Sequence, residues 1–263
     1  MGSATREALS ASRARLDAVA KPSLALAEQL FSAGRIIGQS AQLRTILTET
    51  NGDPENKTNA LTAVFGKSLG ADATAILTTV VESRWSSGDD LLAGIEELGL
   101  RAAASSAAKT TSIGAELFSF GTAVSSDAEL ELALGTKLGS DDAKSALVVS
   151  LLGKASPQTV AIVRQLVLQP RGRRIGELLR NAASIVADQA GESIATVTSA
   201  TPIGTAQLAR LQKGLAASFG RDLAINLVVD PSIIGGLRVQ VGDDVIDGTV
   251  ARKLAELRLQ MAG

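Results

Sequence analysis

Residues 225–249 read INLVVDPSIIGGLRVQVGDDVIDGT, and this stretch decides what the end of the chain becomes. Aliphatic residues alternate over 225–229 and again over 237–241, a period that predicts two strands, each with one face buried. The turn residues Gly242-Asp243-Asp244 predict a hairpin into a short third strand. Asp247-Gly248-Thr249 then reads as the start of a helix, because Asp and Thr side chains accept hydrogen bonds from the first amides of helices.

The residues before and after this stretch also predict strands and helices, and together with it they predict a separate module. Residues 194–199 are rich in β-branched side chains and predict another strand. A helix is expected to follow, with Thr201 as its N-cap and Pro202 in its first turn. Its apolar stripe is Leu208, Leu211, Leu215 and Phe219, and the stripe of a closing helix from about Thr249 is Val250, Leu254, Leu257 and Met261. We therefore expect a small α/β module over residues 191–263.

The preceding sequence contains an internal repeat. Phe31-Ser-Ala-Gly34 is echoed by Phe118-Ser-Phe-Gly121, 87 residues later, and the register persists with one slip to 86. The two copies lie near 24–99 and 113–188. Each reads as short amphipathic helices separated by turn residues, which predicts a helical bundle for each copy.

These patterns predict a mainly α chain of tandem helical bundles followed by the small α/β module. The first bundle is expected over residues 1–106, including a leading helix over 4–20, and the second over 107–190. Strands should be confined to residues after about 190, because only there does the hydrophobic period change from helical spacing to two.

The composition narrows the chemistry. The 263 residues include no Cys and no His, which removes thiolate nucleophiles, imidazole bases and zinc sites built on those ligands. Lys plus Arg number 26 against 27 Asp plus Glu, so there is no net field to attract nucleic acid. No stretch has the roughly 18 apolar residues of a membrane-spanning helix. We expect a cytosolic, unprocessed protein without a membrane span and without nucleic acid as a partner.

The stretch 225–249 closely resembles the carboxy-terminal signature of the ATP synthase delta subunit and oligomycin-sensitivity-conferral protein family. The repeats are similar to the helical bundle that precedes this signature in the family, and the duplication resembles the actinobacterial branch. The resemblance implies a non-catalytic stator subunit that links the alpha/beta catalytic head to the b-type peripheral stalk, without a cofactor. It also implies a peripheral position at the cytoplasmic face of the cell membrane and contacts with the amino-terminal helices of the alpha subunits.

The signature residues are expected to have structural roles, with no catalytic or metal-binding residue among them. The Gly235–Gly236 pair permits positive backbone angles or close chain approach, and Asp247 can accept hydrogen bonds from amides that open the last helix. The full set is Asp230, Gly235, Gly236, Gly242, Asp247 and Gly248.

The resemblance also suggests where partners bind. By analogy with the pairing of the first and fifth helices in the family, an alpha-subunit helix is expected between the leading helix and the helix that carries Val80, preferably in the first copy. The residues expected there are Leu9, Ser12, Leu16, Ile76, Val80 and Val81. The closing stripe of Val250, Leu254, Leu257 and Met261 either receives a stalk helix or packs on the module's own sheet, and the sequence leaves both open.

Other signals are weaker. Gly66-Lys67-Ser68 lacks the first glycine of a nucleotide-binding loop. The basic run over 170–174 is expected to be a solvated loop, with binding of phosphate or an acidic partner as the alternative. A free-standing helical adaptor is the alternative to a stator subunit for the chain as a whole.

Overall fold

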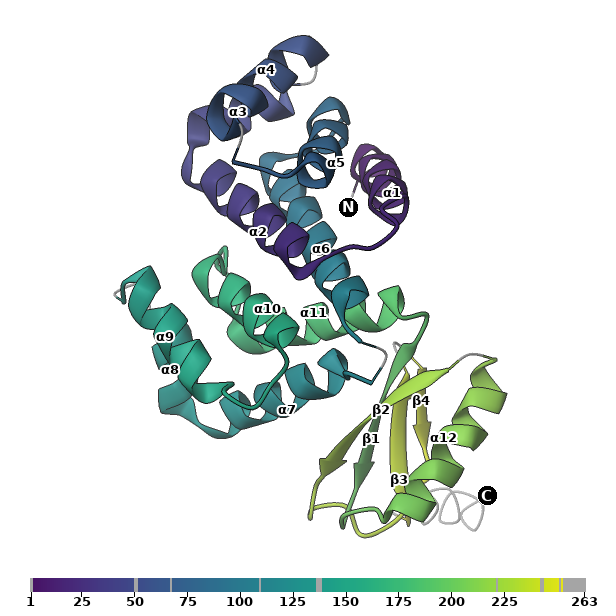
Figure 1. The fold of residues 1–263 in the computed structure, drawn as a ribbon. Helices are drawn as coiled ribbons and strands as arrows, with labels where there is room; N and C mark the ends of the chain where they lie inside the picture. The colour runs from purple at the N-terminus through teal and green to yellow at the C-terminus, as the bar shows by residue number, and fades with distance from the viewer. Residues whose placement is uncertain are drawn as a thin grey trace, which may run out of the picture. The chain divides into compact units, whose positions relative to one another are not determined.

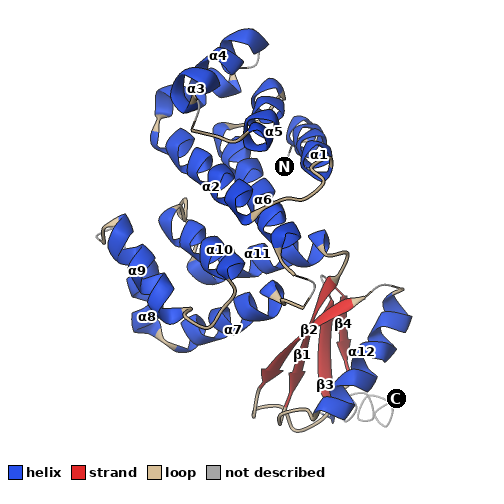
Figure 2. Cartoon of the chain, viewed as in Figure 1, coloured by secondary structure: helices blue, strands red, loops and turns tan. Residues whose placement is uncertain are grey.

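The computed structural model describes residues 2–49, 52–66, 68–108, 110–135, 139–220, 222–241, 244–250 and 252. Helices occupy this part up to residue 189, and a four-stranded sheet with one further helix follows (Figures 1 and 2). The chain divides into two compact units, Met1–Val186 and Ala187–Gly263. The predicted fold class is therefore confirmed, and every strand in the described residues lies after residue 190.

Eleven helices precede the sheet in the described residues. They are α1 (Ser3–Asp17), α2 (Leu24–Gln39), α3 (Ala41–Thr48), α4 (Pro54–Phe65), α5 (Ala71–Glu82), α6 (Gly88–Ser106), α7 (Ile113–Ser126), α8 (Ala128–Gly135), α9 (Asp141–Leu151), α10 (Pro157–Leu168) and α11 (Ile175–Gln189). Most begin after a Ser or Asp whose side chain accepts a hydrogen bond from an amide of the first turn. Such caps satisfy donors that the helix itself leaves free.

The helix boundaries follow the sequence repeat. α3 and α8 begin at Ala41 and Ala128, 87 residues apart, and α5 and α10 begin at Ala71 and Pro157, 86 apart. Helices α2 to α6 thus correspond in order to α7 to α11. At the same offset α1 corresponds to α6, so α6 stands both at the end of the first copy and at the start of the second. The proposed boundary after residue 106 coincides with the end of α6 and stays a prediction.

The core of the helical unit is built on close contact between α2 and α6. The ring of buried Phe31 lies against Gly99, where any larger side chain would overlap it. Trp85 lies in the same way over Gly94 and donates its indole N–H to the Val80 carbonyl at 2.7 Å. Glycines in α6 therefore let two large rings pack against the helix backbone. This packing offsets the cost of glycine's low helix propensity.

Helix α10 of the second copy packs against both α6 and α2. The Gln169 amide donates to the Gly34 carbonyl at 2.9 Å, and Arg35 donates to the side chain of Gln165. The two copies therefore share polar and apolar contacts and do not meet through a linker alone.

The carboxy-terminal unit is a sheet with the order β2-β1-β3-β4. Its strands are β1 (Ser193–Ser199), β2 (Leu223–Val229), β3 (Leu237–Val241) and β4 (Asp244–Asp247). β1 and β2 are parallel and are joined through α12 (Thr205–Phe219), whereas β3 is antiparallel to both β1 and β4. The core of Ala195, Val197, Leu215, Leu223, Val239 and Val241 lies between this sheet and α12.

One predicted boundary is wrong. Helix α12 begins at Thr205 with Gly204 as its N-cap, and Thr201 and Pro202 precede it. The Ser199 hydroxyl donates to the Thr201 carbonyl at 2.7 Å, and this bond holds the chain in a turn at the end of β1. The expected side of α12 is confirmed, since Leu215 is buried in the core and Leu211 and Phe219 pack against it.

Candidate protein-binding surfaces and the signature turn

The signature stretch locks the turn before β3 to the chain after β4. Gly236 has φ of +86°, and a Cβ there would lie 2.9 Å from the Thr249 Cα and closer still to the Gly248 carbonyl oxygen. Two backbone hydrogen bonds join these segments: Gly248 N–H donates to the Leu237 carbonyl at 2.9 Å, and Val250 N–H donates to the Gly235 carbonyl at 3.0 Å. Gly236 is thus needed for close backbone approach, and Gly235 is needed for its φ of +135°.

The two signature aspartates close tight turns. Asp230 Oδ1 accepts from the Ser232 amide at 2.9 Å, and Asp247 Oδ1 accepts from the Thr249 amide at 3.0 Å. Hydrogen bonds from Ser232 lower the pKa of the Asp230 carboxyl, and those from Thr249 lower the pKa of Asp247. The Thr249 hydroxyl oxygen in turn accepts from the Arg252 amide at 3.4 Å, as an N-cap does. These positions hold the fold of the module, and Gly242 lies outside the described residues.

The six residues expected to bind an alpha-subunit helix lie together, inside the bundle. α1 packs against α5 and α6, and the chain's own packing covers the predicted side chains. Leu9, Ser12, Leu16, Ile76, Val80 and Val81 are each at most 4 % exposed. These six side chains lie buried between the helices. A partner helix bound to α1 and α5 would therefore contact the more exposed residues beside them. Their role in binding stays a prediction.

Two acidic residues of α6 were missed by the sequence reasoning. Glu96 accepts from Arg171 at 3.0 Å and from Arg173 at 2.8 Å, while Glu97 pairs with Arg13 of α1 and with Arg101 at 2.8 Å. Both glutamates are buried. The basic run after α10 is therefore not simply solvated, because two of its arginines bind a carboxylate of α6. Adjacent acids on a helix look solvent-facing in sequence, and no local signal reveals partners 77 residues away.

The module exposes several large aliphatic side chains near the signature turn. They are Val229, Ile234, Val245, Ile246 and Val250, with Ile234 at 76 % exposure the most accessible. Val250, the first residue of the predicted closing stripe, is thus at the surface, whereas Leu254, Leu257 and Met261 lie outside the described residues. Val229 and the pair of Val245 and Ile246 lie at opposite edges of the sheet, so these residues are distributed over the module.

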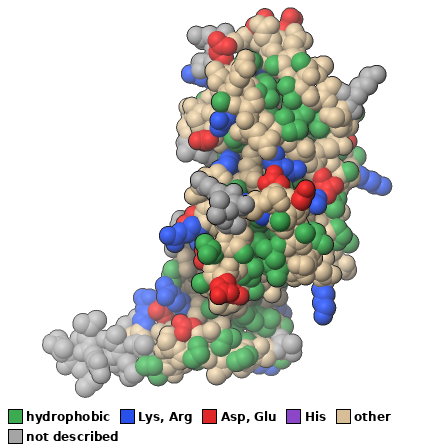
Figure 3. Space-filling view, turned by 90° about the vertical axis from the view of Figure 1, so that its left-hand side faces the viewer, with side chains coloured by type: hydrophobic (Ala, Val, Ile, Leu, Met, Phe, Trp, Pro, Cys, Tyr) green, Lys and Arg blue, Asp and Glu red, His purple; other side chains and the backbone are tan. Residues whose placement is uncertain are grey.

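Charge is evenly distributed on the face in Figure 3, where acidic and basic side chains intersperse. Within the described ranges, no three acidic, Cys or His side chains come together as a metal would require. In the same part of the chain, every helix is too short or too polar to cross a membrane.

Fold and signature together define a helical-repeat protein with a small, turn-locked α/β module. The model of the family described as "ATP synthase delta (OSCP) subunit" matches residues 99–261, and the chain belongs to this family. A protein named ATP synthase subunit delta from Leifsonia xyli subsp. xyli is 55 % identical over 100 % of both chains. One of the same name from Streptomyces griseus subsp. griseus is 39 % identical, also over 100 % of both.

A solved chain gives a weaker similarity. It belongs to the cryo-EM structure of the Toxoplasma gondii mitochondrial ATP synthase hexamer, with 18 % identity, a TM-score of 0.41, and coverage of 64 % of this chain and 96 % of that one. Similarity of this degree carries no argument about function. The family and the full-length relatives suffice: the chain is a structural subunit of ATP synthase with a stator or peripheral-stalk role, is not itself an enzyme, and binds other subunits of that membrane-associated complex.

Proposed function

We propose that the first helical bundle binds the amino-terminal helices of the alpha subunits and that the α/β module binds the b-type stalk subunits. The chain would thereby connect the catalytic head to the peripheral stalk at the cytoplasmic face of the cell membrane. Membership in the delta family replaces the alternative of a free-standing adaptor.

The packing of α2 supports the choice of the first bundle. The repeat relates the α1–α5 pair to the α6–α10 pair, and α2 packs against both α6 and α10. In the second copy, this pair is therefore already covered by a helix of the same chain. The α1–α5 pair keeps exposed positions, including Ala11 and Ala14 on α1 and Thr74 on α5. Small side chains of this kind let a partner helix approach closely.

One observation favours the second bundle instead. The family match begins at residue 99, inside α6, and so covers the second copy and the module but not the first copy. The second copy also exposes Leu132 of α8 and Val149 of α9. Docking on that surface is the second candidate, and the same experiment distinguishes it.

The exposed aliphatic residues of the edge strand β4 and of the chain after it support the stalk contact. Val245 and Ile246 lie on β4, an edge strand of the sheet, and Val250 follows it. Because Val245 and Ile246 face opposite sides of the sheet, a stalk helix along this edge would cover one of them, and this would remove aliphatic surface from water at about 25 cal/mol per Å². Because Gly236 and Asp247 fix the turn, the surface is preformed, which lowers the entropy lost on binding.

The test uses surface substitutions, because Val80 and Leu166 are both buried and a charge at either would test folding rather than docking. We compare Ala11→Glu on α1 with Leu132→Glu on α8, in the full chain, and measure binding of a peptide from the alpha amino terminus. Ala11→Glu should weaken binding at least about tenfold, since an unpaired charge in a helix interface costs more than about 1.4 kcal/mol. Loss with Leu132→Glu alone would assign docking to the second bundle and refute the proposal. Ile234→Glu should affect only binding of a soluble b-subunit fragment.

A further inference from the structure

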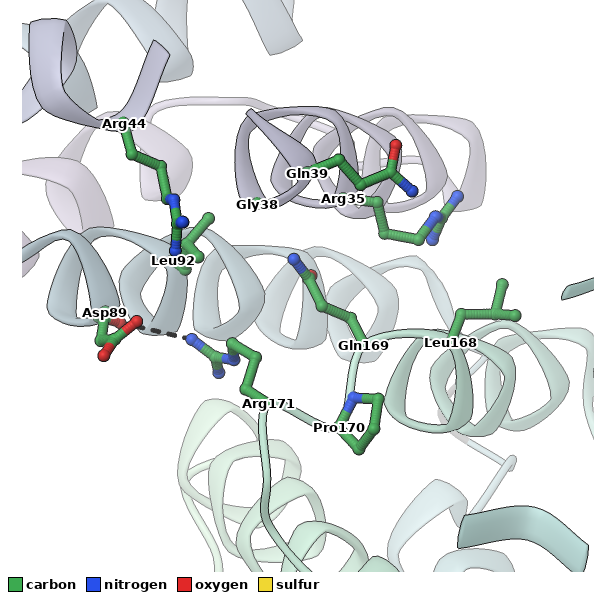
Figure 4. Close-up of a pocket in the computed structure, with 10 residues that line it drawn as sticks. All are labelled: Arg35, Gly38, Gln39, Arg44, Asp89, Leu92, Leu168, Gln169, Pro170 and Arg171. Atoms are coloured by element: carbon green, nitrogen blue, oxygen red, sulfur yellow. Dashed lines mark hydrogen bonds between the residues drawn. The ribbon is translucent and has the colours of Figure 1, made fainter. Parts of the chain in front are cut away.

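A pocket of about 370 Å³ lies where the two helical copies meet (Figure 4). α2, α3 and α6 form one part of its wall, and the end of α10 with the loop after it forms the rest. Its lining residues are Arg35, Gly38, Gln39, Arg44, Asp89, Leu92, Leu168, Gln169, Pro170 and Arg171. Since one water molecule takes about 30 Å³ of liquid, the space is large enough for a small polyatomic ion together with its hydration waters.

Positive charge exceeds negative charge in this lining, with three arginines against Asp89. Arg44 and Arg171 extend into the same region near Asp89, as Figure 4 shows. Arg44 Nε is buried without a hydrogen-bond partner, and no hydrogen bond or ion pair joins its guanidinium to the described residues. This Nε–H therefore lacks the acceptor that a buried donor normally has.

Arg171 is only partly compensated. It donates to Glu96 at 3.0 Å and to the Asp89 carbonyl at 3.3 Å, but its buried Nε has no partner. Glu96 also accepts from Arg173, so one carboxylate pairs with two guanidinium groups. Burial, partly offset by the Glu96 charge, lowers the pKa of Arg171, and burial followed by repulsion from Arg164 lowers the pKa of Arg35.

We propose that this pocket is a binding site for a phosphate-type oxyanion. Arg44 supplies N–H donors in the planar fork that matches two oxygens of one phosphate, and the Arg171 Nε–H, which has no partner, adds a further donor. Hydrogenphosphate carries an O–H that can donate to the Asp89 carboxylate, whereas sulfate at neutral pH does not. The bound ion neutralises the junction between the two copies and stabilises the helical unit.

The phosphate group has two possible sources, inorganic phosphate and the phosphates of a nucleotide. Titration calorimetry on the full chain, at ionic strength held constant with chloride, measures phosphate, pyrophosphate, sulfate and magnesium-free ADP separately. We expect saturable binding with a Kd of about 1 mM for phosphate and weaker binding of sulfate. ADP that competes with pyrophosphate would point to a nucleotide source, and binding of the inorganic ions alone to the free ion; either result supports the site.

Arg44→Gln provides the decisive variant, because the Arg44 side chain makes no hydrogen bond or ion pair with the described residues that the substitution would remove. It should raise the Kd for phosphate at least about tenfold, Arg44→Lys should restore part of the affinity, and Arg15→Gln on the exposed side of α1 should leave it unchanged. The midpoint of thermal unfolding should rise with phosphate in the parent chain and in Arg15→Gln, but not in Arg44→Gln. Absence of saturable binding in the parent chain, or equal binding by Arg44→Gln, would overturn the proposal.

Discussion

Replacing Gly236 with Ala tests whether this signature glycine serves close backbone approach. The added Cβ would meet the Gly248 carbonyl oxygen and the Thr249 Cα, both backbone atoms that cannot rotate away. Positive φ costs a non-glycine residue about 1–2 kcal/mol. Displacing the Gly248 and Val250 segment also weakens two backbone hydrogen bonds, each contributing about 0.5–1.5 kcal/mol. We therefore expect a loss of about 2–4 kcal/mol in the stability of the carboxy-terminal unit.

The control is Gly220→Ala at the end of α12. Gly220 also has positive φ, of +66°, but nothing lies within 4 Å of its would-be Cβ. Ala at this position therefore introduces backbone strain alone, which costs about 1 kcal/mol. Hydrogen exchange of peptides from β1 to β4 is the suitable assay, because the single Trp85 lies in the helical unit and does not report on the sheet. Equal effects of the two substitutions would refute the argument from close approach.

Three further predictions concern the helical unit and its chemistry. Phe31→Ala should cost about 3–5 kcal/mol in urea unfolding followed by tryptophan fluorescence, and Phe118→Ala, its half-buried repeat counterpart, should cost clearly less; equal costs would contradict the asymmetry of the two copies. Hydrogen bonds from Ser156 and Thr159 outweigh the effect of burial and lower the pKa of Glu116, so its stabilisation is present above about pH 4.3 and is lost as pH falls through the lowered pKa. The parent chain should lose stability relative to Glu116→Gln in that window, and parallel pH profiles would exclude this role. Filter binding with labelled ATP should show no magnesium-dependent site at micromolar concentration, since no complete phosphate-binding loop is present; saturation there would contradict this expectation.

Much of the fold is predictable from sequence because each element has a clear period. The alternation over 237–241 has one solution, a strand with Val239 and Val241 facing the core, and the structure has it. The repeat offset is likewise kept by the helix boundaries, including the slip to 86 before α10. These are local properties, set by which residues share a face.

The environment of each face is harder to predict, because it depends on distant parts of the chain. The stripe that includes Leu9 and Val80 is apolar whether a partner or the chain itself covers it, and in the structure α1 and α5 cover each other. Glu96 and Glu97 look like a solvated surface, yet arginines from α1 and from the loop after α10 pair with them. Sequence spacing carries no information on such pairs.

Helix α6 is shared by the two copies, and this matters for a stator subunit, which must resist load. A flexible linker between two bundles would let them move independently under load. Here α6 instead packs against α2 of the first copy and α10 of the second, and at about 1.5 Å per residue it spans roughly 28 Å. Its adjacent glutamates bind Arg13 on one side and Arg171 and Arg173 on the other, and removing one partner of a buried pair typically costs about 3–5 kcal/mol. Bending between the copies would break the ion pairs of Glu96 with Arg171 and Arg173 and the hydrogen bond from Gln169 to the Gly34 carbonyl, so these contacts oppose a hinge at this junction.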